Sequence, residues 1–117
     1  IEDSISIRQT TKDILQSRWP DCYLLEASDG AEGIELAILK QPDLILMDGN
    51  LPIMTGFQMA QLFRMMPSVA SIPLVAITGA DPEHPMVVGM RSLCDAYLPK
   101  PFTVDNLVAT VEQFLPT

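Results

Sequence analysis

Five side chains of this sequence have the types needed for phosphate and metal chemistry: Glu2, Asp3, Asp48, Thr78 and Lys100. Carboxylates held close together repel one another unless a cation or a proton relieves the charge. Mg²⁺ suits this role, because it takes six oxygens and is commonly held by one or two carboxylates together with a phosphate oxygen. A carboxylate can also be a nucleophile that forms an aspartyl phosphate, while a lysine pairs with phosphate charge and a hydroxyl donates to a phosphate oxygen. These residue types therefore predict magnesium-dependent phosphoryl chemistry.

The fold must bring these residues together, and the pattern of the chain predicts how. Short apolar runs alternate with amphipathic stretches, which is typical of a parallel α/β sheet. The predicted helices cover about residues 5–17, 29–40, 55–66, 85–93 and 104–115, and the predicted strands 23–27, 44–47, 72–78 and 96–98. In an open parallel sheet, ligands bind beyond the carboxyl ends of the strands. Glu2 and Asp3 are placed at the end of the first strand, Asp48 and Thr78 at the ends of the third and fourth, and Lys100 after the fifth. We therefore expect the five residues to converge on one pocket.

The start of the chain does not fit the alternation. Only Ile1, Glu2 and Asp3 precede the first predicted helix, which is too few for the buried strand that the pattern demands there. Such a strand contributes roughly 1.5–3 kcal/mol for each buried apolar side chain. We therefore expect residues 1–117 to be one domain of a longer protein, with the first strand largely missing from this chain.

Composition and charge exclude several function classes. The 117 residues include 15 Asp and Glu against 7 Lys and Arg, a net charge of −8, so this domain is not expected to bind nucleic acid directly. No uninterrupted apolar stretch exceeds four residues, so membrane insertion is not expected either. Cys22 and Cys94 lack a CxxC pattern, which fits a reducing compartment. The expected location is the cytoplasm, or the cytoplasmic part of a membrane-bound hybrid kinase.

The chain resembles the receiver domain of two-component response regulators over essentially its whole length. Four segments carry the resemblance: Glu2-Asp3-Ser4; the loop Met47-Asp48-Gly49-Asn50-Leu51-Pro52-Ile53-Met54-Thr55-Gly56; Ile77-Thr78; and Tyr97-Leu98-Pro99-Lys100-Pro101-Phe102. The resemblance implies a flavodoxin-like, doubly wound sheet of five parallel strands in the order 2-1-3-4-5, with five helices. It also implies a regulatory phosphoacceptor domain that assists its own phosphorylation and dephosphorylation.

The resemblance assigns a role to each site residue. Asp48 would accept a phosphoryl group from a phosphohistidine on a histidine kinase or a histidine phosphotransfer protein. Glu2, Asp3, Asp48 and the backbone carbonyl of Asn50 would bind Mg²⁺, with Glu2 acting through water. Lys100 and Thr78 would contact the phosphoryl oxygens, and the Lys100-Pro101 peptide would be cis, an arrangement whose cost is small only before proline.

The same resemblance implies a conformational switch. Thr78 would move toward the phosphoryl group and Tyr97 would turn inward. These movements would alter the face built from the fourth helix, the fifth strand and the fifth helix, which is also a candidate face for dimerisation. Phosphorylation acts in this way only through the difference between its contacts in the two states.

Two readings from other classes remain as alternatives. A phosphatase of the haloacid dehalogenase type also uses a strand-end aspartate, a threonine or serine and a lysine, but it needs a second aspartate two residues after the nucleophile, where this chain has Asn50. A flavin-binding module would need a phosphate loop rich in Ser, Thr and Gly after the first strand, and none is present.

Overall fold

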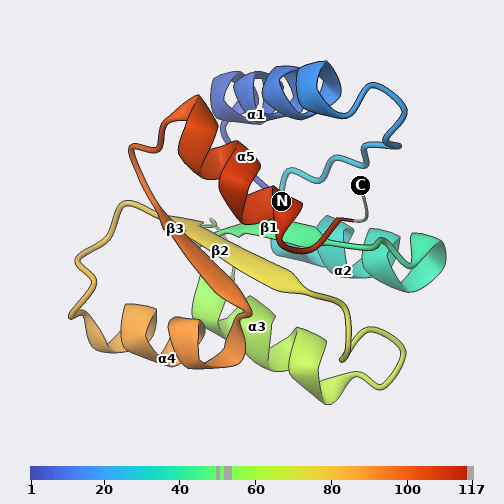
Figure 1. Cartoon of the computed structure of the whole chain (residues 1–117). Helices are drawn as coiled ribbons and strands as arrows, with labels where there is room; N and C mark the ends of the chain where they lie inside the picture. Colours follow the sequence, from blue (N-terminus) through green and yellow to red (C-terminus); the bar gives the residue numbers. More distant parts are fainter. Residues whose placement is uncertain (50, 52–53, 116–117) are drawn as a thin grey trace.

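The structure, a computed structural model, describes residues 1–49, 51 and 54–115. Over these residues the chain forms five helices and a parallel sheet of three strands (Figure 1). In chain order, the elements are α1 (Ile5–Arg18), α2 (Gly30–Lys40), β1 (Ile45–Asp48), α3 (Gly56–Met65), β2 (Leu74–Thr78), α4 (Pro85–Leu93), β3 (Ala96–Pro99) and α5 (Val104–Glu112). In this part of the chain, no helix has the length and apolar character needed to cross a membrane.

The sheet has the order β1-β2-β3, with both pairs parallel. In the registers, Asp48 lies opposite Ile77, and Thr78 lies opposite Pro99. The last residues of all three strands therefore meet at one edge of the sheet, as expected for an α/β protein whose ligand site lies beyond the carboxyl ends of its strands.

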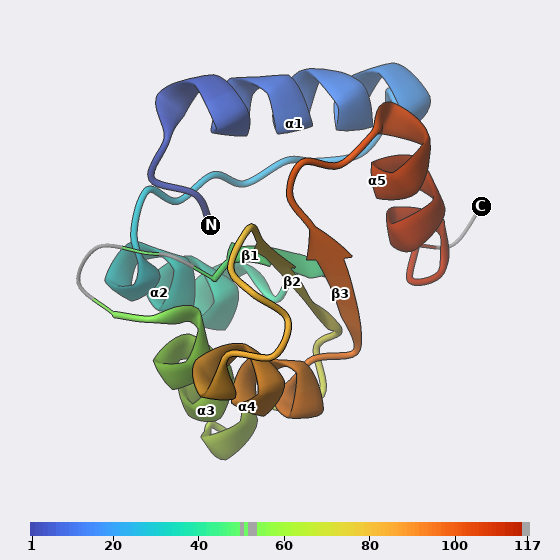
Figure 2. The ribbon, with the colours of Figure 1, turned by 90° about the vertical axis from the view of Figure 1, so that its left-hand side faces the viewer.

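Helices cover both faces of the sheet, which explains why the strands lack polar alternation (Figure 2). One core gathers side chains from α2, α3, α4 and the sheet, with Phe63, Met59 and Met47 almost fully buried. The other gathers side chains from α1, α5 and the sheet, with Leu107 and Val111 at its centre. These two cores fix the sheet between two layers of helices.

The helices begin where the sequence predicts, because polar side chains satisfy the free N–H groups of each first turn. Asp29 accepts from the N–H of Glu32 at 2.9 Å. Thr55 and Gln58 form a reciprocal capping box at the start of α3. The five capping residues are Ser4, Asp29, Thr55, His84 and Thr103.

The predicted strand over residues 23–27 is not formed, and the described sheet has three strands where the resemblance implies five. The last residue of this segment, Ala27, contacts the first residues of the chain: its carbonyl accepts from the N–H of Glu2 at 3.0 Å. On the other side, the N-terminal amine of Ile1 donates to the Leu46 carbonyl at 2.7 Å. Because only these two residues lie between β1 and the 23–27 segment, that segment has no partner strand along most of its length among the described residues.

Candidate functional site

Asp48 is the last residue of β1 and is 5% exposed. The strand holds it firmly, because Met47 before it is fully buried and the N–H of Asp48 donates to the Ile1 carbonyl at 2.9 Å. A carboxylate removed from water in this way needs compensating charge or hydrogen bonds. The other residues of the site supply both.

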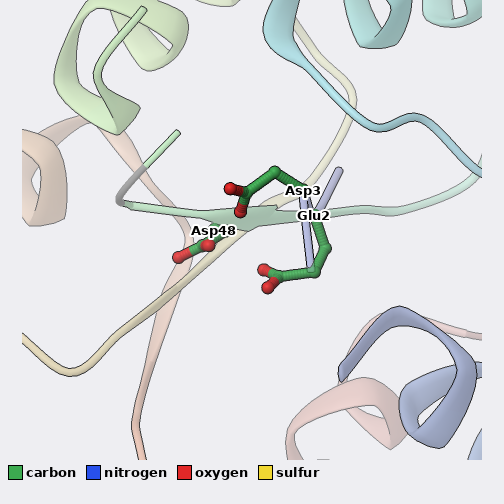
Figure 3. Close-up of side chains that lie close together, drawn as sticks. All are labelled: Glu2, Asp3 and Asp48. Atoms are coloured by element: carbon green, nitrogen blue, oxygen red, sulfur yellow. The ribbon is translucent and has the colours of Figure 1, made fainter. Parts of the chain in front are cut away.

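Glu2 and Asp3 lie beside Asp48, on the segment that leads into α1. One ligand oxygen from each of the three carboxylates can be chosen so that all lie within 4.8 Å of one another. Figure 3 shows the three side chains gathered at the end of β1. The neighbouring helix fixes this segment at its other end, where the Ser4 hydroxyl accepts from the N–H of Ile7.

The carboxyl group of Glu2 has a strongly perturbed pKa, raised from 4.5 to about 7. Burial is the largest cause, followed by a hydrogen bond to the Asp48 side chain and the negative charge of Asp48, while Lys100 acts in the opposite direction. Around neutral pH, the Glu2 carboxyl is therefore partly protonated. A divalent cation placed between Glu2 and Asp48 would replace that proton.

The donor set fits Mg²⁺. Mg–O distances of about 2.1 Å put opposite ligands of an octahedral ion about 4.2 Å apart, so carboxylate oxygens within 4.8 Å need only a small adjustment or one bridging water. The three donors are hard carboxylate oxygens, and the side chains of Glu2 and Asp48 are largely buried. The residues that would hold the ion are Glu2, Asp3 and Asp48; Asn50, the fourth expected ligand, lies outside the described residues.

Lys100 reaches the acidic cluster from the residue after β3. Its Nζ lies 3.3 Å from Oδ1 of Asp48 and 3.6 Å from Oε2 of Glu2. Its N–H donates to the Thr78 carbonyl at 2.8 Å, and the Lys100–Pro101 peptide is cis. The ammonium is thus positioned to neutralise charge that develops next to Asp48.

Thr78 ends β2 and is 2% exposed, and its hydroxyl accepts from the N–H of Ala80 at 3.0 Å. It lines an open cleft of about 670 Å³ together with Glu2, Asp3, Asp48 and Lys100. The structure therefore brings all five predicted site side chains to one cleft: Glu2, Asp3, Asp48, Thr78 and Lys100.

The chain after Asp48 turns closely against the start of α3. The N–H of Gly56 donates to the Gly49 carbonyl at 3.1 Å, and a Cβ atom on Gly56 would lie 2.6 Å from the Gly49 Cα. Only glycine fits at position 56 without displacing backbone. This contact sets where the loop after Asp48 rejoins the fold.

Tyr97 lies in β3, away from the cleft, and packs against the core formed with α3 and α4. Its hydroxyl is buried and has no hydrogen-bond partner among the described residues. The guanidinium of Arg91 on α4 stacks over its ring, 4.5 Å from the centroid. Tyr97 is therefore held between α4 and the sheet.

Two further residues near the site were not predicted from the sequence. Arg8 on α1 donates from Nη1 to the Glu2 carbonyl at 2.8 Å. His84 caps α4 and lines the cleft, although its side chain is exposed. The only sequence signal for Arg8 was its place one turn after the Ser4 cap, and the only one for His84 was the proline that follows it.

Comparison with known proteins agrees with this geometry. The family model of the response regulator receiver domain matches residues 1–112. This chain belongs to that family. It is 38% identical over 90 residues to the DNA-binding dual master transcriptional regulator RpaA of Synechocystis sp., a match that covers 77% of this chain and 37% of RpaA.

Solved receiver structures share the fold of this domain. The chemotaxis response regulator CheY4 of Vibrio cholerae superposes with a TM-score of 0.84 at 32% identity, covering 97% of this chain and 93% of CheY4. The receiver domain of the sensor histidine kinase PA1611 of Pseudomonas aeruginosa has a TM-score of 0.85 at 22% identity, covering 97% and 92%; a magnesium ion is coordinated in its active site cleft. The chain is thus a receiver domain of two-component signalling, a class of regulatory domain that works with a kinase.

Proposed function

We propose that this receiver domain is a phosphoacceptor and that Asp48 takes a phosphoryl group from a phosphohistidine of a histidine kinase or a histidine phosphotransfer protein. The observation that carries this proposal is the environment of Asp48: a buried strand-end carboxylate, with Lys100 Nζ at 3.3 Å and two further carboxylates in reach of the same cation. That combination neutralises the charge that phosphorylation brings to the site.

In the proposed reaction, a carboxylate oxygen of Asp48 attacks phosphorus while the N–P bond of the phosphohistidine breaks, and the leaving imidazole takes up a proton. Mg²⁺, when bound by Glu2, Asp3 and Asp48, supplies charge neutralisation and alignment. Lys100 pairs with a phosphoryl oxygen, and the Thr78 hydroxyl donates to another once it releases the N–H of Ala80. Alignment and electrostatics provide most of the rate in such transfers.

The output is proposed to pass through the face formed by α4, β3 and α5. Movement of Thr78 toward the phosphoryl group pulls on the loop between β2 and α4, and Tyr97 lies beneath α4 on this face. The same face is proposed as a dimerisation surface, since Val88 and Val104 expose about half of their area there. The match covers 37% of RpaA, so we also propose that this domain belongs to a longer protein.

Phosphorylation with a small-molecule donor tests the proposal. Acetyl phosphate with Mg²⁺ is expected to add one phosphoryl group to the domain, seen by intact-mass spectrometry, and none to Asp48→Asn. Asp43→Asn, an aspartate remote from the cleft, is the matched control and should be phosphorylated like the unmodified domain. Rapid turnover of an unrelated phosphate ester would instead support the haloacid dehalogenase type of phosphatase.

A further inference from the structure

Arg8 connects α1 to the acidic segment through the backbone, not through the carboxylates. Its Nη1 donates to the Glu2 carbonyl at 2.8 Å, and its Nε lies 3.5 Å from Oε1 of Glu26. Its side chain is 24% exposed, so most of the guanidinium stem is packed in place. Lys12, one turn further along α1, pairs with the same Glu26 at 3.1 Å, but in the described part of the chain it makes no hydrogen bond or ion pair with Glu2.

The Glu2 residue is consequently held on both sides. Its N–H donates to the Ala27 carbonyl at 3.0 Å, and its carbonyl accepts from Arg8. That carbonyl belongs to the peptide that joins Glu2 to Asp3. The orientation of this one peptide sets the directions in which both acidic side chains leave the backbone.

We propose that Arg8 is a positioning residue for the magnesium site: by fixing the peptide between Glu2 and Asp3, it aligns the carboxylates for the ion. The inference rests on the proposed function only in requiring that the site binds Mg²⁺. Mg²⁺ demands near-ideal octahedral geometry, and residues that orient metal ligands typically change metal affinity 10- to 100-fold when replaced.

If Arg8 acted only through its charge, replacing it would change the Mg²⁺ affinity in the opposite direction. A cation close to three carboxylates repels an incoming Mg²⁺, so removing its charge would tighten binding. Since the guanidinium is partly exposed and paired with Glu26, this effect is screened and small. Positioning predicts weaker binding instead, so the direction of the change separates the two roles.

The test is a calorimetric titration of the domain with MgCl₂. Arg8→Met keeps the aliphatic stem but loses the donors, and we expect it to bind Mg²⁺ about 10-fold more weakly. Lys12→Met, the matched control, removes the same charge from the same Glu26 pair and is expected to bind as the unmodified domain does. Arg8→Lys keeps the charge and one donor, and its affinity should lie between the two.

Urea denaturation without Mg²⁺ is measured in parallel, because a merely structural role would lower stability without changing the affinity of the folded fraction. Mg²⁺ binding by folded Arg8→Met that equals or exceeds that of the unmodified domain would overturn the inference. If Arg8→Met does not fold, Arg8→Lys decides: an affinity equal to that of the unmodified domain overturns the inference, and a weaker one supports it.

Failure of this inference can be told from failure of the proposed function. If the unmodified domain binds Mg²⁺ and is phosphorylated on Asp48, but the Arg8 variants bind Mg²⁺ normally, only the role of Arg8 is wrong. If the unmodified domain binds no Mg²⁺, the inference about Arg8 falls together with the metal-dependent step of the proposed function.

Discussion

The raised pKa of Glu2 makes metal binding at this site sensitive to pH. In the folded domain the pKa of Glu2 is about 7 against an ordinary 4.5, so the folded state holds more protons than the unfolded state between these values. By linkage, the stability that Glu2 contributes is present below about pH 4.5 and is lost as the pH rises through 7. Bound Mg²⁺ would compete with the same proton.

We therefore expect the apparent Mg²⁺ affinity to rise between pH 6 and pH 8 and to level off above, because the ion displaces a proton only at the lower pH values. Titrations at pH 6, 7 and 8 measure this directly. In Glu2→Gln, which cannot take up the proton, the pH dependence should be much shallower. An equally steep dependence in Glu2→Gln would show that another group holds the proton.

Replacing Lys100 should affect the conformational response to phosphorylation more than phosphorylation itself. Lys100→Ala is expected to leave phosphorylation by acetyl phosphate in place, because Asp48 is the nucleophile, but to weaken the response of α4 and β3, since the contact with a phosphoryl oxygen is lost. Amide NMR shifts of α4 and β3 before and after phosphorylation are the measurement. Lys12→Ala, which breaks only the ion pair with Glu26, serves as the control. A full response in Lys100→Ala would remove Lys100 from the switch.

The buried Tyr97 hydroxyl has no partner among the described residues, which costs about 1–3 kcal/mol in desolvation. Removing it in Tyr97→Phe is therefore expected to leave the free energy of unfolding unchanged or to raise it by about 1 kcal/mol. Urea denaturation measures the change, with Tyr23→Phe, which alters a ring that is 82% exposed, as the control. A loss of stability greater than in Tyr23→Phe would mean that the hydroxyl is satisfied in solution.

At the scale of elements, Arg64 of α3 contacts the carboxyl end of α4 and the loop over residues 66–73. Its guanidinium donates to the carbonyls of Leu93, Ala70 and Ile72 at 2.8, 2.9 and 3.1 Å, and to Asp95 at 2.7 Å. Burial alone would raise the pKa of Asp95, but the N–H of Leu74 and the Arg64 guanidinium outweigh it and hold the pKa below its usual value. The carboxyl end of α4 is thereby tied to β2 and α3.

Because Arg64→Ala leaves three carbonyls and one carboxylate without this donor, we expect it to lower the free energy of unfolding by about 2–4 kcal/mol. The control is Arg18→Ala, which breaks a pair with Glu112 whose side chains are more than 40% exposed, and should cost less than about 1 kcal/mol. Urea unfolding of both variants at one pH gives the comparison. Equal losses would show that the Arg64 contacts add little.

The elements show why sequence reasoning succeeded in some places and failed in others. Helix starts were predictable because capping is local: Asp29 with Glu32 and Thr55 with Gln58 lie within one turn. The strand-end carboxylates and Lys100 lie together as expected because parallel topology brings strand ends to one edge, although their roles remain predictions. The contacts of Arg64 and the absent strand at 23–27 could not be predicted, because they depend on partners distant in sequence.

At the scale of the whole molecule, a groove of about 530 Å³ lies beside β1. Its lining side chains include Leu15, Leu24, Leu44 and Leu46 of the core on the α1 and α5 side. Ala37 and Ile45 of the other core also line it. At one end, Ile1 bonds to β1 through Leu46 and Asp48, while Glu2 bonds to Ala27. There the chain already lies between β1 and the 23–27 segment as a middle strand would.

We expect an apolar extension added before Ile1 to fill this groove as a parallel strand. We compare a variant that carries five residues rich in Val and Ile before Ile1 with a matched variant that carries five Gly and Ser residues there. The free energy of unfolding of the apolar variant should be higher by at least about 3 kcal/mol, since each buried apolar side chain adds roughly 1.5–3 kcal/mol. Urea denaturation compares their stabilities, and amide exchange should show new protection at 23–27, which gains a strand partner only in the apolar variant. If both extensions give the same stability and exchange, the groove does not accept a strand placed before Ile1.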